Sequence, residues 1–116
     1  MMNYKQGDIM LVWFPDSNLV TVKKRPAIVL QTDDLQTGLD QLIIGMITSN
    51  LMRKGHPSRI FVDIHTTIGQ QTGLIDDSVI MTDNLATICI SETYKKIGTF
   101  GELNVLKEAI RHTFGI

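Results

Sequence analysis

The side chains best suited to chemistry are one arginine and a Thr-Ser pair. Arg25 stands directly before Pro26 and an apolar run over residues 27–30. Because proline disfavours helical geometry in the residue before it, we expect Arg25 to be extended at a strand entrance, with its guanidinium free to point into a groove. Thr48 and Ser49 follow another apolar run, over residues 42–47. Together they would offer a cation and hydroxyl or amide donors, which suit a phosphate group.

Each feature also has an ordinary structural interpretation. Residues 23–25 alone resemble a solvated basic turn that leads into a core strand. Thr48 and Ser49 alone resemble a strand-terminating turn. The functional interpretation therefore depends on whether the fold brings the two segments together.

Other kinds of site have weaker support. His56, His65 and His112 lie in separate segments without metal-ligand spacing around them. The pair Asp76-Asp77 is typical of a turn before a strand, and Cys89 has no nucleophile motif and is expected to be a buried apolar filler. The glycines are isolated and form no phosphate-binding loop. We therefore expect no metal and no nucleotide cofactor.

Length and composition predict one domain over residues 1–116. Apolar residues make up 43% of the 116-residue chain and charged residues 20%, the balance of a soluble globular protein. The N-terminal residues lack the apolar core of a signal peptide, and the run over residues 9–14 is too short to cross a bilayer. We expect a cytoplasmic protein without membrane contact. A net charge of −1 argues against a global basic field, although cations gather locally.

Hydrophobic periodicity predicts a mostly β protein with a C-terminal helix. Strands are expected over residues 8–14, 26–31, 42–47 and 59–64, with one or two more over 79–81 and 85–90. Residues 16–18 are typical of a turn, residues 32–41 of a loop with one helical turn, and Gly45 of a bend or bulge. Leu103, Leu106 and Phe114 belong to a stripe at helical spacing. These elements predict an α+β fold that is built on a strongly bent antiparallel sheet or a small barrel.

Six short motifs in a fixed order give the chain a resemblance to the MazF/PemK family of type II toxin–antitoxin ribonucleases. They are Gly-Asp-Ile at 7–9, Lys-Arg-Pro-Ala-Ile-Val-Leu at 24–30, Ile-Thr-Ser at 47–49, Gly-Leu-Ile at 73–75 with Ser-Val-Ile at 78–80, Asp-Asn-Leu-Ala-Thr at 83–87, and Lys-Ile-Gly at 96–98. Each motif is weak alone, but their order covers nearly the whole chain.

The resemblance implies a small SH3-like barrel that forms a homodimer and cleaves single-stranded RNA, such as mRNA. It also implies a cognate antitoxin with an acidic tail that blocks the RNA groove. In the family, the arginine of the Arg-Pro motif and the threonine of the Ile-Thr-Ser motif are the catalytic pair, which corresponds to Arg25 and Thr48 here.

The same hypothesis assigns supporting roles to further residues. Ser49 would help Thr48 donate hydrogen bonds to the phosphate, and Asp83 would orient Arg25 or a 2′-hydroxyl. The candidate contacts to the RNA backbone are Lys23, Lys24, Arg53 and Lys54. The alternative is that these four residues are solvated loop charges. Metal-independent attack by the 2′-hydroxyl would leave a 2′,3′-cyclic phosphate and a 5′-hydroxyl.

Two other functions remain open at this point. The same groove would serve a nucleic-acid-binding barrel that holds RNA or DNA without cutting it. The chain would also suit a toxin that acts by binding a protein target such as a topoisomerase.

Overall fold

The computed structural model describes residues 4–15, 18 and 20–116. Its elements follow one another as β1 (Asp8–Pro15), β2 (Val22–Val29), β3 (Gln41–Thr48), η1 (Leu51–Arg53), β4 (Arg59–Val62), α1 (Thr67–Gln71), β5 (Ser78–Cys89), η2 (Ile90–Glu92), β6 (Thr93–Thr99) and α2 (Leu103–Phe114). The mostly β, α+β class predicted from the sequence is confirmed, with two α-helices instead of one.

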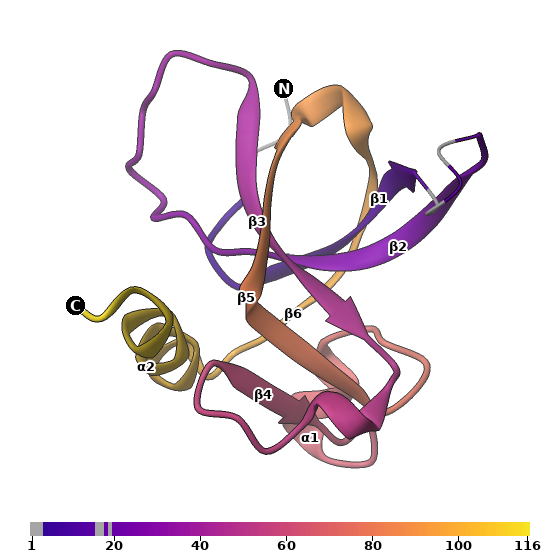
Figure 1. Ribbon diagram of the computed structural model, residues 1–116, viewed down its shortest axis with the longest axis vertical. Coiled ribbons are helices and arrows are strands. Elements are labelled where there is room, and N and C mark those ends of the chain that lie inside the picture. The colour runs from indigo at the N-terminus through magenta and orange to yellow at the C-terminus, as the bar shows by residue number, and fades with distance from the viewer. Residues whose placement is uncertain (1–3, 16–17, 19) are drawn as a thin grey trace.

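The strands form one antiparallel sheet in the order β4-β5-β3-β2-β1-β6. The sheet is strongly bent (Figure 1), but its pairing does not close into a barrel. Within the described residues β4 and β6 are edge strands, and each pairs with one neighbour. The sheet stays open because β4 pairs with only the first part of β5, while α2 packs beside both strands.

Gly45 marks the bend in β3, as its position predicted. It pairs with Leu85 of β5, whereas the next residue, Met46, pairs with Met81, so residues 82–84 interrupt the ladder. A Cβ atom at Gly45 would lie 3.1 Å from both Leu30 Cδ1 and the Met81 carbonyl oxygen. The absence of a side chain therefore lets β3 and β5 stay close at the irregularity.

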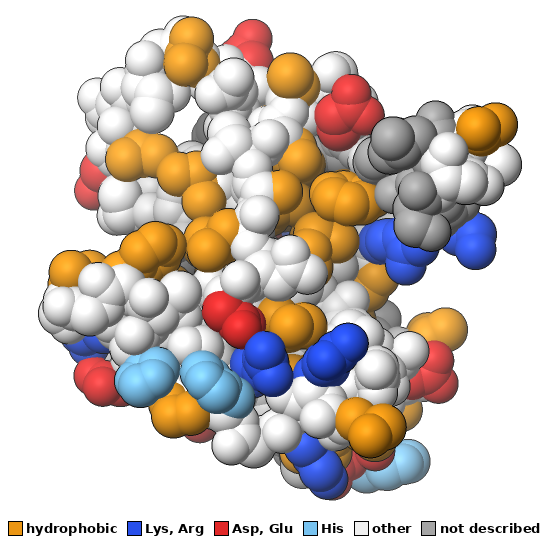
Figure 2. Space-filling model, viewed as in Figure 1, with side chains coloured by type: hydrophobic (Ala, Val, Ile, Leu, Met, Phe, Trp, Pro, Cys, Tyr) orange, Lys and Arg blue, Asp and Glu red, His pale blue; other side chains and the backbone are white. Residues whose placement is uncertain are grey.

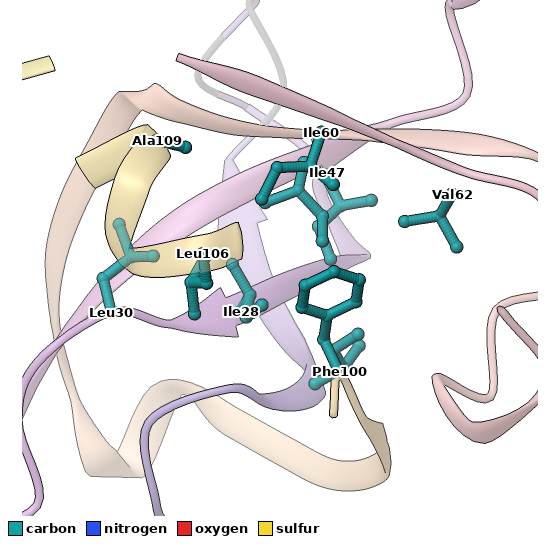
Figure 3. Close-up of a cluster of buried hydrophobic side chains, with 10 residues drawn as sticks. Ile28, Leu30, Ile47, Ile60, Val62, Phe100, Leu106 and Ala109 are labelled. Atoms are coloured by element: carbon teal, nitrogen blue, oxygen red, sulfur yellow. The ribbon is translucent and has the colours of Figure 1, made fainter. Parts of the chain in front are cut away.

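Both faces of the central strands are buried. In β1, the adjacent residues Ile9 and Met10 are inaccessible to solvent and belong to separate clusters. Successive strand side chains point to opposite faces, so the prediction that this apolar strand is covered on both sides is confirmed. Figure 3 shows the first cluster, which joins Leu106 and Ala109 of α2 to Ile28 of β2 and to Leu30, just after that strand.

Helix α2 has the predicted position and stop signal. Leu106 and Ala109 are its buried residues, and Gly115 adopts a left-handed φ of 68° directly after it. The Gly115 N–H donates to the Arg111 carbonyl oxygen, which satisfies one of the free carbonyls at the helix end. In the described part of the chain, no helix has the length and apolar character needed to cross a membrane.

Several sequence predictions need correction. Strand β2 begins at Val22, so Pro26 lies inside the strand and not at its start. It is tolerated because β3 pairs only with residues 27–29 of β2, and the missing N–H interrupts no bond of that ladder. Residues 32–41 contain no helical turn. Cys89 is exposed, because it lies at the far end of β5 beyond the buried part of that strand.

Four elements were not predicted: β6, α1 and the short 3-10 turns η1 and η2. Strand β6 carries the polar run Tyr94-Lys95-Lys96, and α1 has only five residues. Of the turn predicted over residues 16–18, Asp16 and Ser17 lie outside the described residues. The Asn18 side-chain oxygen accepts from the N–H groups of Val20 and Thr21, which is the expected turn chemistry.

Candidate active site

A cleft of about 560 Å³ opens where β2 and β3 diverge. The two strands pair only over residues 27–29 of β2, so the first half of β2 continues past the end of β3. In Figure 2 the hollow opens on the right, with Lys and Arg side chains on its upper edge. Its lining consists of Leu11, Lys24, Arg25, Pro26, Ile47, Thr48, Ser49, Gly73, Leu74, Ile75, Asp76, Ser78, Lys95 and Ile97.

Strand β2 supplies the cationic side of the cleft. Lys24 and Arg25 are exposed residues of this strand, held in register opposite Trp13 and Val12 of β1. Pro26, the next residue, is opposite Leu11, and both contribute apolar surface to the lining. The arginine is thus extended, as the Arg-Pro sequence predicted, and its backbone is fixed by the β1 ladder.

The end of β3 supplies hydroxyl groups. Ile47 is buried in the core, while the following Thr48 is half-buried at the edge of the cleft. Thr48 Oγ1 accepts a hydrogen bond from the Asn50 N–H at 3.1 Å, and Asn50 Oδ1 in turn accepts from the Met52 N–H at 3.2 Å. Because the accepted bond uses an oxygen lone pair, the Thr48 hydroxyl proton stays available for a ligand. Ser49 lies beside it, exposed, in the same lining.

The opposite wall comes from the segment between α1 and β5. Asp77 Oδ1 accepts from the Ile64 N–H at 3.0 Å, so this carboxylate fixes the loop. Its neighbour Asp76 is exposed and lines the cleft, and the Asp76 carbonyl oxygen accepts from Ser78 Oγ at 2.8 Å. Among the described lining residues, Asp76 alone is acidic. The two adjacent aspartates therefore have different surroundings: the Asp77 carboxylate is hydrogen-bonded to backbone, and Asp76 belongs to the exposed lining of the cleft.

Glycine lets this wall approach β6. Gly73 has a φ of +73°, and a Cβ atom there would overlap the Ile97 carbonyl oxygen. Gly98 is similarly tight, since its Cβ atom would overlap the backbone of Thr72. Gly73, Lys95 and Ile97 all line the cleft. Backbone contact between these segments thus sets the width of the site.

The structure brings together Arg25, Thr48, Ser49 and Lys24, but not the other predicted residues. Lys23, Arg53, Lys54 and Asp83 do not belong to the described lining. The Lys54 ammonium lies 4.9 Å from the ring centroid of Phe61, on strand β4.

Asp83 has a different partner from the predicted one. Its carboxylate accepts from Arg59 Nη2 at 2.9 Å and from Arg59 Nε at 3.3 Å, and Arg59 Nη1 also donates to the Arg53 carbonyl oxygen at 3.1 Å. The hydrogen bonds from Arg59 lower the pKa of Asp83. This residue is placed to tie β5 to β4 and η1.

Asp76 and Lys95 were not predicted as cleft residues. Asp76-Asp77 had the pattern of a turn, and nothing separated the two carboxylates. The pair Lys95-Lys96 was recognised as a cation cluster, but strand β6 was not predicted, so its pairing with β1 could not be inferred. In the structure Lys96 pairs with the buried Asp8 at 3.2 Å, whereas Lys95 lines the cleft. Only the register of β6 separates these roles.

The fold is similar to that of several solved toxins. The Mycobacterium tuberculosis toxin MazF-mt6 shares 23% identity at a TM-score of 0.72, with 94% of this chain and 97% of that chain covered. An endoribonuclease in complex with its cognate antitoxin, from a mycobacterial species, shares 13% identity at a TM-score of 0.74, covering 97% and 96%. A MazE–MazF structure from Deinococcus radiodurans shares 17% identity at a TM-score of 0.73, covering 100% and 99%.

Sequence comparison places the chain more specifically. A search of curated protein sequences returned no significant match. The family model of the PemK-like, MazF-like toxins of type II toxin–antitoxin systems matches residues 5–112. Since that match spans nearly the whole chain, this protein belongs to the PemK/MazF-like toxin family.

Proposed function

We propose that this protein is an endoribonuclease toxin that cleaves single-stranded RNA in the cleft between β2 and β3. The observation that carries the proposal is that Arg25 and Thr48, from strands separated along the chain, line one cleft. Family membership supports the proposal, as does the similarity of the fold to proteins named as endoribonucleases.

The reaction uses the nucleophile that RNA carries. The 2′-hydroxyl attacks the adjacent phosphorus, a P–O2′ bond forms, and the P–O5′ bond breaks. The products are a 2′,3′-cyclic phosphate and a 5′-hydroxyl. Arg25 stabilises the negative charge that develops on the phosphoryl oxygens and is a candidate donor of the proton to the 5′-oxygen. Thr48 donates a hydrogen bond to a phosphoryl oxygen, with Ser49 beside it.

A base must take the proton from the 2′-hydroxyl. Arginine is poorly suited, because a guanidinium group is a very weak acid and keeps its proton. Asp76 is the acidic residue of the described cleft lining, so we assign it as the candidate general base. Asp77 is not assigned this role because its carboxylate accepts from the Ile64 N–H.

Cations at the cleft would hold the RNA backbone. Lys24 and Lys95 line it directly, whereas Lys23 lies farther out on β2. Arg53 and Lys54 follow the end of β3, and we propose that they contact nucleotides beyond the cleft. Cations that neutralise phosphates release counterions from the RNA, so the affinity for RNA is expected to fall as the salt concentration increases.

The partners follow from the same proposal. A type II toxin has a cognate antitoxin, and an acidic antitoxin segment would compete with RNA for the cations of the cleft. The Deinococcus radiodurans toxin of similar fold was solved as a MazE–MazF complex. We further propose that residues 1–116 act as a single cytoplasmic domain, that the open, bent sheet follows an SH3-like arrangement, and that two copies form a homodimer.

The test is to incubate the purified protein with a long unstructured RNA and to determine the chemistry of the new ends. We expect cuts at a short sequence, with 2′,3′-cyclic phosphate and 5′-hydroxyl termini. Binding without new ends would support the non-catalytic nucleic-acid-binding barrel instead. Intact RNA together with capture of a protein such as a topoisomerase would support the protein-targeting alternative.

A further inference from the structure

A cluster of aromatic and cationic side chains lies beside the cleft. Trp13 and Tyr94 are 39% and 48% exposed, although both belong to strands. Their rings meet edge to face, with centroids 5.8 Å apart and an interplanar angle of 76°. The Lys24 ammonium lies 4.2 Å from the Tyr94 ring centroid and 5.5 Å from that of Trp13. The three side chains therefore form one surface, here called the aromatic cluster.

Strand register makes the aromatic cluster continuous with the cleft. Trp13 of β1 pairs with Lys24 of β2, and on its other side β1 pairs with β6, where Leu11 is opposite Lys95. Lys24 and Lys95 both line the cleft and both place an ammonium over the Tyr94 ring, Lys95 at 6.0 Å. The same two lysines thus belong to the cleft and to the aromatic surface beside it.

This combination suits one class of ligand. Surfaces that bind single-stranded nucleic acid combine cations, which contact phosphates, with exposed aromatic rings, on which bases stack. An acidic peptide would use the lysines but would gain little from two exposed rings. Cation–π contacts in the free protein also mean that an incoming base can replace an ammonium on a ring face, while the ammonium moves to a phosphate.

We propose that Trp13 and Tyr94 form a stacking subsite for one unpaired base next to the scissile phosphate, with Lys24 and Lys95 holding the flanking phosphate. This inference rests on the proposed function and extends it to a residue-level binding site. Because every base has an aromatic face, the subsite selects unstacked, single-stranded RNA and not a particular base.

The chain contains one tryptophan, so its intrinsic fluorescence reports on Trp13 alone. A uniformly 2′-O-methylated oligonucleotide spanning the mapped cleavage site lacks the nucleophile, so it binds without being cut. We expect saturable quenching of Trp13 by this probe and little quenching by its duplex. An abasic residue moved along the probe should abolish quenching at one position beside the scissile phosphate. Equal quenching at every abasic position would overturn the proposal.

Variants supply the second measurement. Tyr94→Ala and Trp13→Ala are expected to raise KM for RNA about 5- to 100-fold, the range for one base–aromatic stack, with kcat nearly unchanged. Tyr94→Phe keeps the ring and should behave as wild type, which excludes a purely structural effect. Phe114→Ala is the control, because Phe114 is an exposed aromatic residue at the end of α2 that lies outside the cleft lining.

The outcomes separate this inference from the proposed function. Cleavage with unchanged KM in Tyr94→Ala and Trp13→Ala would refute the stacking subsite and leave the nuclease intact. Position-specific quenching without any cleavage of RNA would refute the nuclease and support the subsite. Where wild type does not cut, the probe is a mixed-sequence 2′-O-methyl oligonucleotide. Quenching by an acidic peptide and by no oligonucleotide would overturn the inference and assign the cluster to a protein partner.

Discussion

Replacing Gly73 by alanine tests how the cleft wall is built. Gly73 has a φ of +73°, and its added Cβ atom would overlap the Ile97 carbonyl oxygen. Two costs therefore apply. The left-handed backbone costs an L-residue roughly 1–2 kcal/mol, and forcing an atom into a packed space typically costs about 1–3 kcal/mol.

Together these costs predict a loss of about 2–5 kcal/mol in the free energy of unfolding for Gly73→Ala. For a domain of this size that corresponds to a melting temperature lower by roughly 8–20 °C. The matched control is Gly55→Ala. Gly55 has a φ of +93°, but nothing lies within 4 Å of its added Cβ atom, so only the backbone cost applies.

Urea or thermal unfolding of both variants measures the difference between them. RNA cleavage is then compared at a temperature where both are folded. Because Gly73 and Ile97 both line the cleft, pushing them apart displaces its wall, and a displacement of about 1 Å can cost about 10²-fold in rate. If Gly73→Ala is no less stable than Gly55→Ala, the close backbone contact between this wall and β6 is refuted.

Three further predictions concern the site and its surroundings. Thr48→Ala should lower kcat about 10²–10³-fold by removing one donor to the phosphoryl oxygen, and a rate within about threefold of wild type would make Thr48 a structural strand end. Asp76→Asn should lower kcat, whereas Asp77→Asn, which keeps the acceptor for Ile64, should not; equal effects would contradict the assignment. Because Arg59 lowers the pKa of Asp83, their pair stabilises the fold above the unfolded pKa of that carboxyl and loses this contribution as pH falls through the folded pKa. Arg59→Met should thus be less stable near neutral pH, by less than about 1 kcal/mol, and in acid the difference should shrink to the loss of the hydrogen bond to the Arg53 carbonyl; urea unfolding at several pH values checks this.

The elements that the sequence predicted well have a strong pattern of their own. Strand β1 is an apolar run between a glycine and a proline, and α2 has an apolar stripe with a glycine stop signal. Both were found nearly to the residue. Strand β6 was missed because an edge strand with one pairing partner needs little apolar surface, and Tyr94-Lys95-Lys96 carry none of the usual alternation.

The candidate site was predictable only in part. The Arg-Pro and Ile-Thr-Ser motifs identified Arg25 and Thr48, and the divergence of β2 from β3 explains why they share a cleft. Asp83 shows the limit of such reasoning, because its partner Arg59 lies on β4, which pairs with β5 across a long separation in sequence. Asp76 and the aromatic cluster depend on the same kind of long-range register, which local patterns do not encode.

The catalytic role of Arg25 is best measured by cleavage of an unstructured RNA with Arg25→Ala, in parallel with wild type and Arg25→Lys. We expect wild type to leave 2′,3′-cyclic phosphate and 5′-hydroxyl ends. Arg25→Ala should be inactive but as stable as wild type, since Arg25 is an exposed strand residue. Arg25→Lys, which keeps the charge but loses the planar fork, should retain only a small part of the rate. Wild-type cleavage rates in a folded Arg25→Ala variant would contradict the account.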